Sequence, residues 1–262
     1  MAITIPSIML ALKDANSCKA AINIASSVAA FYKSTVNCLV FGSSGQVDAS
    51  KFPGAKFSST NLVGSNPHKE IIKQYNGSNA DLLIVPITSS QDGAGLLTAS
   101  EANKIIYTLE RMVLTVPCEK DDYNFLDIVV PIDTSFETRQ KVPYAVSIAK
   151  ALNARLHVLG VSNDKGKDAE VVIKNYTRQV YNNIEEKGLH CTVDMRLGGN
   201  PTEQIINFAQ EKKAGLILIM TEQETNFTSF FTGKYSEQMI KNSPVPVLSI
   251  HPKDLIISDA RL

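Results

Sequence analysis

The chain has 262 residues, of which 44% are hydrophobic and 20% charged, a balance that predicts a packed core in one large or two modest domains. Lysine plus arginine and aspartate plus glutamate both number 26, so the chain lacks the basic excess expected of a nucleic-acid binder. No apolar run reaches the roughly 18 residues that would indicate a membrane span, and the opening MAITIPSIMLALKD lacks the early positive charge of a secretory signal.

The N-terminal half begins with an apolar stretch, IMLALKD (8–14), which is expected to form a strand ending at Asp14. The segment GSSGQVDASKFPGA (42–55) is rich in glycine, serine and proline and predicts a loop. Asn66 can then cap a helix that has Pro67 at its first position. The half closes with a further apolar strand, MVLTV (112–116).

The C-terminal half alternates apolar runs with helical patterns throughout. Such alternation predicts a parallel sheet covered by helices on both faces. In chain order we expect strand 126–132, helix 136–152, strand 155–161, helix 168–187, strand 191–197, helix 201–212, strand 215–220, helix 234–242 and strand 245–250.

The two halves are copies of one pattern, because VGSNPHKEIIKQYNGSNADLLIVP (63–86) aligns with LGGNPTEQIINFAQEKKAGLILIM (197–220). The offset is 119 residues between Asp14 and Asp133 but 134 between Asn66 and Asn200, so the second copy holds 134 − 119 = 15 extra residues. They fall in an amphipathic stretch, 167–188, that predicts a helix. The first copy is therefore expected to lack one helix, and to expose an apolar patch or a chain contact there.

The cysteines and histidines favour no metal site. Cys38 and Cys191 lie in strand-like stretches where a free thiol behaves as a small hydrophobe, and the chain has no C-x-x-C pair. This usage favours a reducing, cytoplasmic location. The four histidines show no ligand spacing.

Several motifs together resemble the universal stress protein family: VVPIDTS, ARLHVLGV, GNPTEQII, AGLILIMT and SPVPVLSI. The resemblance implies an α/β fold of two doubly wound, five-stranded parallel-sheet domains, the first shortened at 1–119, the second full-length at 124–252, with a tail at 253–262. Family domains pair through their last strands, so the resemblance also implies an intramolecular pseudo-dimer in which 112–116 lies against 246–250.

The family's nucleotide-binding branch has a G-x2-G-x9-G-[ST] loop after the fourth strand and an aspartate after the first. The loop falls on Pro86, Ser89, Ala99 and Ser100 in the first copy and on Met220, Gln223, Gly233 and Lys234 in the second. Only Ser100 and Gly233 match, while both aspartates are present. The candidate cofactor-binding residues that the resemblance implies are Asp133, Gly233, Lys234, Asp14 and Ser100.

Three alternatives stay open at this stage. Lys234 is either part of an anion site or an exposed lysine at a helix start. Asp133 is either a ligand group or a helix-entry residue. Phe227, Phe230 and Phe231 form either a partner surface or lid, or a small core beneath their loop.

No catalytic motif such as G-x-S-x-G or H-E-x-x-H is present. With the family resemblance, this absence implies a non-enzymatic, tandem stress-response module with degenerate nucleotide sites and no cofactor. It is expected to act through an unknown protein partner and not through nucleic acid or membrane. The alternative is an ATP or AMP sensor that uses an altered site in the second copy. A slow ATPase is the third hypothesis, and a further homodimer of tandem chains is left open.

Overall fold

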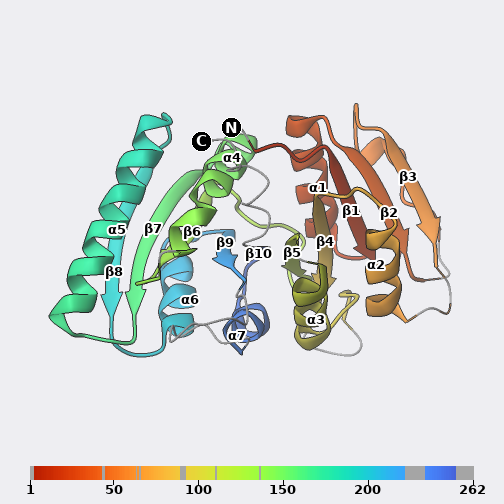
Figure 1. Cartoon of the computed structure of the whole chain (residues 1–262). Coiled ribbons are helices and arrows are strands. Elements are labelled where there is room, and N and C mark those ends of the chain that lie inside the picture. The colour runs from red at the N-terminus through yellow and green to blue at the C-terminus, as the bar shows by residue number, and fades with distance from the viewer. Residues whose placement is uncertain are drawn as a thin grey trace. The chain divides into compact units, whose positions relative to one another are not determined.

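The computed structural model describes residues 3–42, 45–62, 64, 66–88, 93–109, 111–135, 137–221 and 234–251, excluding the side chains of residues 137 and 234. The chain divides into two compact units (Figure 1). The N-terminal unit is Thr4–Tyr123, and the C-terminal unit is Asn124–Leu262 with Met1–Ile3.

The N-terminal unit is a parallel sheet with strand order β3-β2-β1-β4-β5. This order places β1 at the centre, with the chain winding first to one side and then to the other, as in a doubly wound fold. Its elements are β1 (Ser7–Leu12), α1 (Lys19–Tyr32), β2 (Thr35–Val40), the 3-10 turn η1 (Ala49–Lys51), β3 (Phe57–Asn61), α2 (Pro67–Asn76), β4 (Leu82–Ile87), α3 (Ala99–Leu109) and β5 (Met112–Pro117).

The C-terminal unit repeats this winding, with parallel strands in the order β8-β7-β6-β9-β10. Its elements are β6 (Asp127–Ile132), the 3-10 helix η2 (Glu137–Lys141), α4 (Val142–Leu152), β7 (Arg155–Ser162), α5 (Lys167–Glu186), β8 (Cys191–Leu197), α6 (Pro201–Glu211), β9 (Leu216–Met220), α7 (Lys234–Asn242) and β10 (Val247–Ile250). The expected five parallel strands are thus present in each unit.

The sequence explains why these elements form. Strands β4, β5 and β6 are buried at every position, as expected of parallel strands covered on both faces. Asn66 and Asn200 cap α2 and α6 as predicted: their side-chain oxygens accept hydrogen bonds from Lys69 N at 3.4 Å and from Thr202 N at 2.9 Å.

One predicted helix is divided. The pattern 136–152 predicted a continuous helix, but the structure has a 3-10 turn over Glu137–Lys141 followed by α4 from Val142. Pro143 lies in the first turn of α4, where its missing N–H removes no intrahelical hydrogen bond. The proline therefore sets the start of the α-helix.

The expected loss of a helix in the first copy is confirmed. Between β2 and β3, the described residues form only the turn η1, whereas α5 occupies the equivalent place between β7 and β8. The accompanying prediction of an exposed apolar patch is wrong for the described residues of this region. Val47 and Phe52 from the replacing loop are 4% and 2% exposed, and Phe52 stacks on Phe57 with ring centroids 5.0 Å apart.

Cys38 and Cys191 are buried free thiols, as predicted. Burial raises the pKa of each to about 12. The sequence did not predict that Cys18 and Cys118 form a disulfide, because they are 100 residues apart in the chain.

Candidate functional site

A cavity of about 490 Å³ lies at the carboxyl end of β1, where doubly wound sheets bind ligands. Three segments line it: the turn that follows β1, the loop that follows β2, and the loop that follows β4. The lining residues are Lys13, Asp14, Ala15, Asn16, Ser17, Gly45, Gln46, Gly93 and Ala94. The loop that replaces the missing helix therefore supplies part of the wall, through Gly45 and Gln46.

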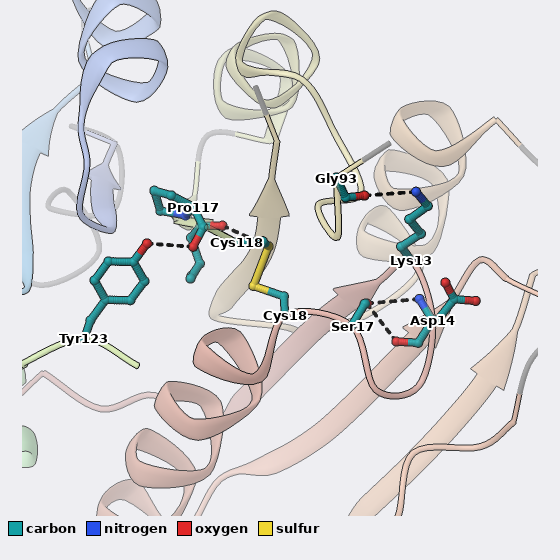
Figure 2. Close-up of a disulfide and its surroundings, with 9 residues drawn as sticks. Lys13, Asp14, Ser17, Cys18, Gly93, Pro117, Cys118 and Tyr123 are labelled. Atoms are coloured by element: carbon teal, nitrogen blue, oxygen red, sulfur yellow. Dashed lines mark hydrogen bonds between the residues drawn. A yellow bond between two sulfur atoms is a disulfide. The ribbon is translucent and has the colours of Figure 1, made fainter. Parts of the chain in front are cut away.

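Asp14 is held in a tight turn. Ser17 Oγ accepts a hydrogen bond from Asp14 N at 3.0 Å, and both Ser17 Oγ and Ser17 N donate to the Asp14 carbonyl oxygen, at 2.8 and 3.0 Å. Figure 2 shows this turn with the disulfide beside it. A side chain at position 42 would clash with the carboxylate, because a Cβ on Gly42 would lie 2.0 Å from Asp14 Oδ1. The structure thus places Asp14 in the cavity, and Gly42 permits its position.

The loop after β4 folds back over the end of its strand. Lys13 Nζ donates a hydrogen bond of 3.0 Å to the Gly93 carbonyl oxygen (Figure 2). Leu96 N donates to Pro86 O at 2.9 Å, and Gly95 packs so closely that a Cβ there would lie 2.3 Å from the Ile87 carbonyl carbon. These contacts position the Gly93 side of the cavity.

Ser100 is not brought into the cavity. It lies exposed in the first turn of α3, while Pro86 is within β4 and Ala99 is the first residue of α3. Ser89, the remaining position of this motif, lies outside the described residues. The amino end of α3 is instead capped by Thr98, whose hydroxyl accepts a hydrogen bond from Glu101 N at 3.3 Å.

In the C-terminal unit, Asp133 serves the turn that leads into η2. Its Oδ1 accepts hydrogen bonds from Ser135 N at 2.7 Å and from Ser135 Oγ at 2.5 Å. Asp133 therefore has the contacts of a helix-entry residue, one of the two interpretations that the sequence left open. Asp133 N donates to Thr138 Oγ1 at 3.3 Å.

A buried lysine beside Asp133 was missed from the sequence. Lys141 is 3% exposed, and its Nζ donates to Thr138 Oγ1 at 3.0 Å. Burial lowers the pKa of Lys141 to about 8, and the nearby charge of Asp133 partly opposes this shift. The only signal in the sequence was a lysine immediately before the apolar stripe of α4.

Gly233 and the aromatic residues Phe227, Phe230 and Phe231 lie outside the described residues. Lys234 is the first residue of α7, but its side chain is not described.

A second polar cluster lies at the amino ends of β6 and β7, at the opposite end of the strands from Asp133. Asp127 accepts hydrogen bonds from Arg155 Nε at 2.9 Å and Nη2 at 2.8 Å, and lies 2.7 Å from His157 Nε2. His157 Nδ1 lies 2.7 Å from Thr192 Oγ1. Burial raises the pKa of Asp127, but the hydrogen bonds and charges of Arg155 and His157 outweigh it and hold this pKa below its usual value. The cluster joins three neighbouring strands, so we interpret it as stabilising the sheet.

Within the described part of the chain, no group of three histidine, cysteine or acidic residues is placed to hold a metal ion. Among the described helices, none is long and apolar enough to cross a membrane.

Comparison with known proteins agrees with this fold. Residues 124–251 match the universal stress protein family model. A universal stress protein of Methanocaldococcus jannaschii is 28% identical over 160 residues, which cover 56% of this chain and 94% of that protein.

Several solved structures match nearly the whole chain. A functionally unknown protein from Pseudomonas aeruginosa PAO1 aligns with a TM-score of 0.69 and 19% identity, covering 97% of this chain and 95% of its own. A universal stress protein from Archaeoglobus fulgidus DSM 4304 aligns with a TM-score of 0.66 and 19% identity, covering 95% and 100%. At these identities the structures show the fold alone, and the match to the family model is confined to residues 124–251.

Proposed function

We propose that this chain is a non-catalytic stress-response module made of two universal-stress-protein units, with nucleotide sites that are degenerate for triphosphates. It would act through binding, with the cavity beside Asp14 (the Asp14 cavity) taking a small polar ligand. The observation that carries the proposal is that the amino end of α3, where the family resemblance would place the phosphates of a nucleotide, is capped by side chains of this protein.

That helix end is occupied by the chain's own groups. Thr98 N and Thr98 Oγ1 both donate to Glu101 Oε2 at 2.9 Å, and Glu101 N donates back to Thr98 Oγ1 at 3.3 Å. A phosphate binds a helix start through free amides and the positive end of the helix dipole. The Thr98–Glu101 capping box uses one of those amides and adds a negative charge, so it disfavours a phosphate.

The chemistry of the Asp14 cavity supports binding. Its ionisable lining groups are Lys13 and Asp14, and the Lys13 amine already contacts the Gly93 carbonyl. With Asn16, Ser17 and Gln46, they offer donors and acceptors for a polar ligand. A volume of about 490 Å³ is within the usual range for small-molecule sites.

The alternative function is an ATP or AMP sensor in the C-terminal unit, using Asp133, Gly233 and Lys234. One observation favours it: among the described residues, α7 begins at Lys234, and a helix amino end is where a phosphate site would be expected. Asp133 directly follows β6, and Asp14 lies two residues after the end of β1.

Native mass spectrometry with ATP, AMP and adenosine tests both functions, using wild type, Asp14→Ala and Asp133→Ala. We expect no ATP complex at millimolar ATP, and no phosphate release above a protein-free blank. An ATP complex that Asp133→Ala abolishes would instead establish the alternative function. Phosphate release that disappears in either variant would overturn the non-catalytic proposal.

The tandem arrangement has its own test. We propose that 112–116 pairs with 246–250 in an internal pseudo-dimer, and that the module works in the cytoplasm with a protein partner or a second copy of itself. A protease site inserted at 119–123 should leave the two halves associated after cleavage, as measured by native mass spectrometry. Separation of the cleaved halves would contradict the pairing without requiring any core substitution.

A further inference from the structure

We propose that Cys18 and Cys118 form a reversible thiol–disulfide site whose oxidised state holds the Asp14 cavity in shape. The redox site does not depend on the proposed function, but its use in regulating ligand binding rests on the proposed binding role of the cavity.

The disulfide joins two places that the sheet keeps apart. Cys18 immediately precedes α1, and Cys118 immediately follows β5, with their Cα atoms 5.1 Å apart. In the strand order β1-β4-β5, the bridge therefore spans the carboxyl end of β4. Figure 2 shows it between the start of α1 and the end of β5, on the side where Ser17 and Asp14 lie.

On the α1 side, the disulfide is one residue from the cavity wall. Ser17 both lines the cavity and closes the Asp14 turn through its hydrogen bonds. Cys18 has a φ of 48°, in the left-handed region that residues with a Cβ rarely adopt. It also provides no side-chain cap for α1. Reducing the disulfide therefore removes a covalent link to β5 and leaves the Asp14 turn held only by its own short-range hydrogen bonds.

On the β5 side, the tether reaches the strand that supports the opposite wall. β5 pairs with β4 to its end, with Pro86 beside Val116 and Ile87 beside Pro117. The Pro86 carbonyl oxygen accepts hydrogen bonds from Leu96 N and Leu97 N. The segment 93–97, which carries Gly93 and Ala94 of the cavity wall, thus rests on the strand end that the disulfide crosses.

The environment of the four cysteines confines thiol chemistry to this pair. Cys38 and Cys191 are buried, with pKa values raised by burial to about 12, so little reactive thiolate is available there. Cys118 is partly exposed, whereas Cys18 is buried at the start of α1. An external thiol therefore reaches the Cys118 sulfur first.

A dithiol reductant can open the Cys18–Cys118 disulfide by two thiol–disulfide exchange steps. One reductant thiolate forms a bond to Cys118 Sγ, the Cys18–Cys118 bond breaks, and the electron pair leaves on Cys18 Sγ. That thiolate lies at the amino end of α1, where the helix dipole favours a negative charge. The second reductant thiolate attacks the mixed disulfide and releases the Cys118 thiolate, so the reductant becomes a disulfide by losing two electrons. Oxidised glutathione reverses the reaction and is itself reduced.

The experiment first counts thiols and then follows amide hydrogen exchange. The full chain is equilibrated with oxidised glutathione or with dithiothreitol, denatured, alkylated and weighed. We expect two alkylated cysteines, Cys38 and Cys191, after oxidation and four after reduction. In the native protein, reduction should speed exchange in 14–18 and 93–97 by about tenfold or more, as local opening becomes easier. Exchange in 133–141 of the C-terminal unit should not change.

Two variants provide the controls. The double variant Cys18→Ser with Cys118→Ser should show the fast exchange in both conditions, whereas Cys191→Ala should respond like wild type. Four alkylated cysteines after oxidised glutathione would overturn the redox site. Two alkylated cysteines with unchanged exchange in 14–18 and 93–97 would overturn its control of the cavity. Neither readout uses a ligand, so a failure to detect ligand binding would not contradict the redox inference. Likewise, a failure of the redox inference would not contradict the proposed binding function.

Discussion

The side-chain amine of Lys13 donates a 3.0 Å hydrogen bond to the main-chain carbonyl oxygen of Gly93, 80 residues later in the chain. This bond joins the turn after β1 to the loop after β4 and so connects two walls of the Asp14 cavity.

Replacing Lys13 by methionine keeps the length of the side chain and removes the donor. Since a hydrogen bond of this kind contributes about 1 kcal/mol, amide exchange near Gly93 should accelerate roughly fivefold. Hydrogen exchange with mass spectrometry measures this. The control is Lys19→Met, which makes the same substitution at an exposed lysine that does not line the cavity and pairs with Asp121. Equal exchange near Gly93 in Lys13→Met and wild type would show that the bond does not hold the loop.

The second prediction concerns Gly42. A methyl group there would lie 2.0 Å from Asp14 Oδ1 and 2.6 Å from the Lys13 carbonyl oxygen, so the main chain must shift. We expect Gly42→Ala to lower the free energy of unfolding of the N-terminal unit by about 1–3 kcal/mol, as overpacking does. It should also lower the affinity for any ligand whose binding Asp14→Ala weakens. Urea denaturation and a binding titration measure the two effects.

The matched control for this substitution is Gly77→Ala. Its nearest contacts would be 3.6 and 3.7 Å, which is ordinary van der Waals distance, and its φ of −84° suits alanine. Stability should change by less than about 0.5 kcal/mol. If Gly42→Ala were equally neutral, the close approach of Asp14 to position 42 would be refuted.

The features that could be predicted from the sequence are those that local spacing encodes. The Asn-Pro pairs at 66–67 and 200–201 predicted two helix starts, and both asparagines cap as expected. The difference in offset between the two copies predicted the missing helix. In each case a few neighbouring residues determine the backbone, so periodicity and capping chemistry suffice.

The unpredicted features join residues that are distant in the chain. The Cys18–Cys118 disulfide spans 100 residues, and the Lys13–Gly93 bond spans 80. The burial of Lys141 depends on how η2 and α4 pack, and no spacing rule encodes it. The expected apolar patch failed because the loop after β2 folds its own Phe52 inward.

The third prediction tests the Thr98–Glu101 capping box as a barrier to phosphate. Glu101→Gln keeps a hydrogen-bonding side chain and removes its charge from the amino end of α3. Because a charge at a helix end contributes about 0.3–1 kcal/mol, ATP affinity should rise by up to roughly fivefold while adenosine affinity stays unchanged. Since we expect no wild-type complex at millimolar ATP, the rise would appear as weak ATP binding in the variant alone. Calorimetric titration measures both. Glu170→Gln, in the first turn of α5, is the control and should change neither. An unchanged ATP affinity in Glu101→Gln would remove this support for the degenerate site.

The fourth prediction concerns Asp127, whose side chain is 4% exposed and contacts both Arg155 and His157. Asp127→Asn should lower the free energy of unfolding by about 1–3 kcal/mol at pH 7, since hydrogen bonds to a charged group are lost. The folded pKa of Asp127 is below its unfolded value of 3.8, so its stabilisation is complete above that pH and is lost in stronger acid.

The stability difference between wild type and Asp127→Asn should therefore stay constant above about pH 5 and shrink as the pH falls below 4. Denaturant titrations across this range measure it. The exposed Asp168 offers a control, because Asp168→Asn should cost less than about 0.5 kcal/mol. A difference that grows in acid would contradict the lowered pKa.

The fifth prediction concerns Lys141, whose pKa falls from 10.5 to about 8 on burial. Between these two values the unfolded chain keeps a proton that the folded protein has released, so the free energy of unfolding rises with pH across this window. The shift corresponds to roughly 3 kcal/mol. Below pH 8 the folded protein must hold a buried ammonium group and gains none of this stability.

Lys141→Met removes the charge and keeps the side chain's length. The variant should be more stable than wild type by about 3 kcal/mol at pH 7, and the difference should vanish near pH 10.5. Urea denaturation at several pH values measures both. The buried thiols Cys38 and Cys191, with raised pKa values, lower stability above pH 9 in both proteins, so only the difference between the curves reports on Lys141. Parallel curves would show that Lys141 keeps its ordinary pKa. Curves that converge toward pH 10.5 would confirm that burial lowers the pKa of Lys141.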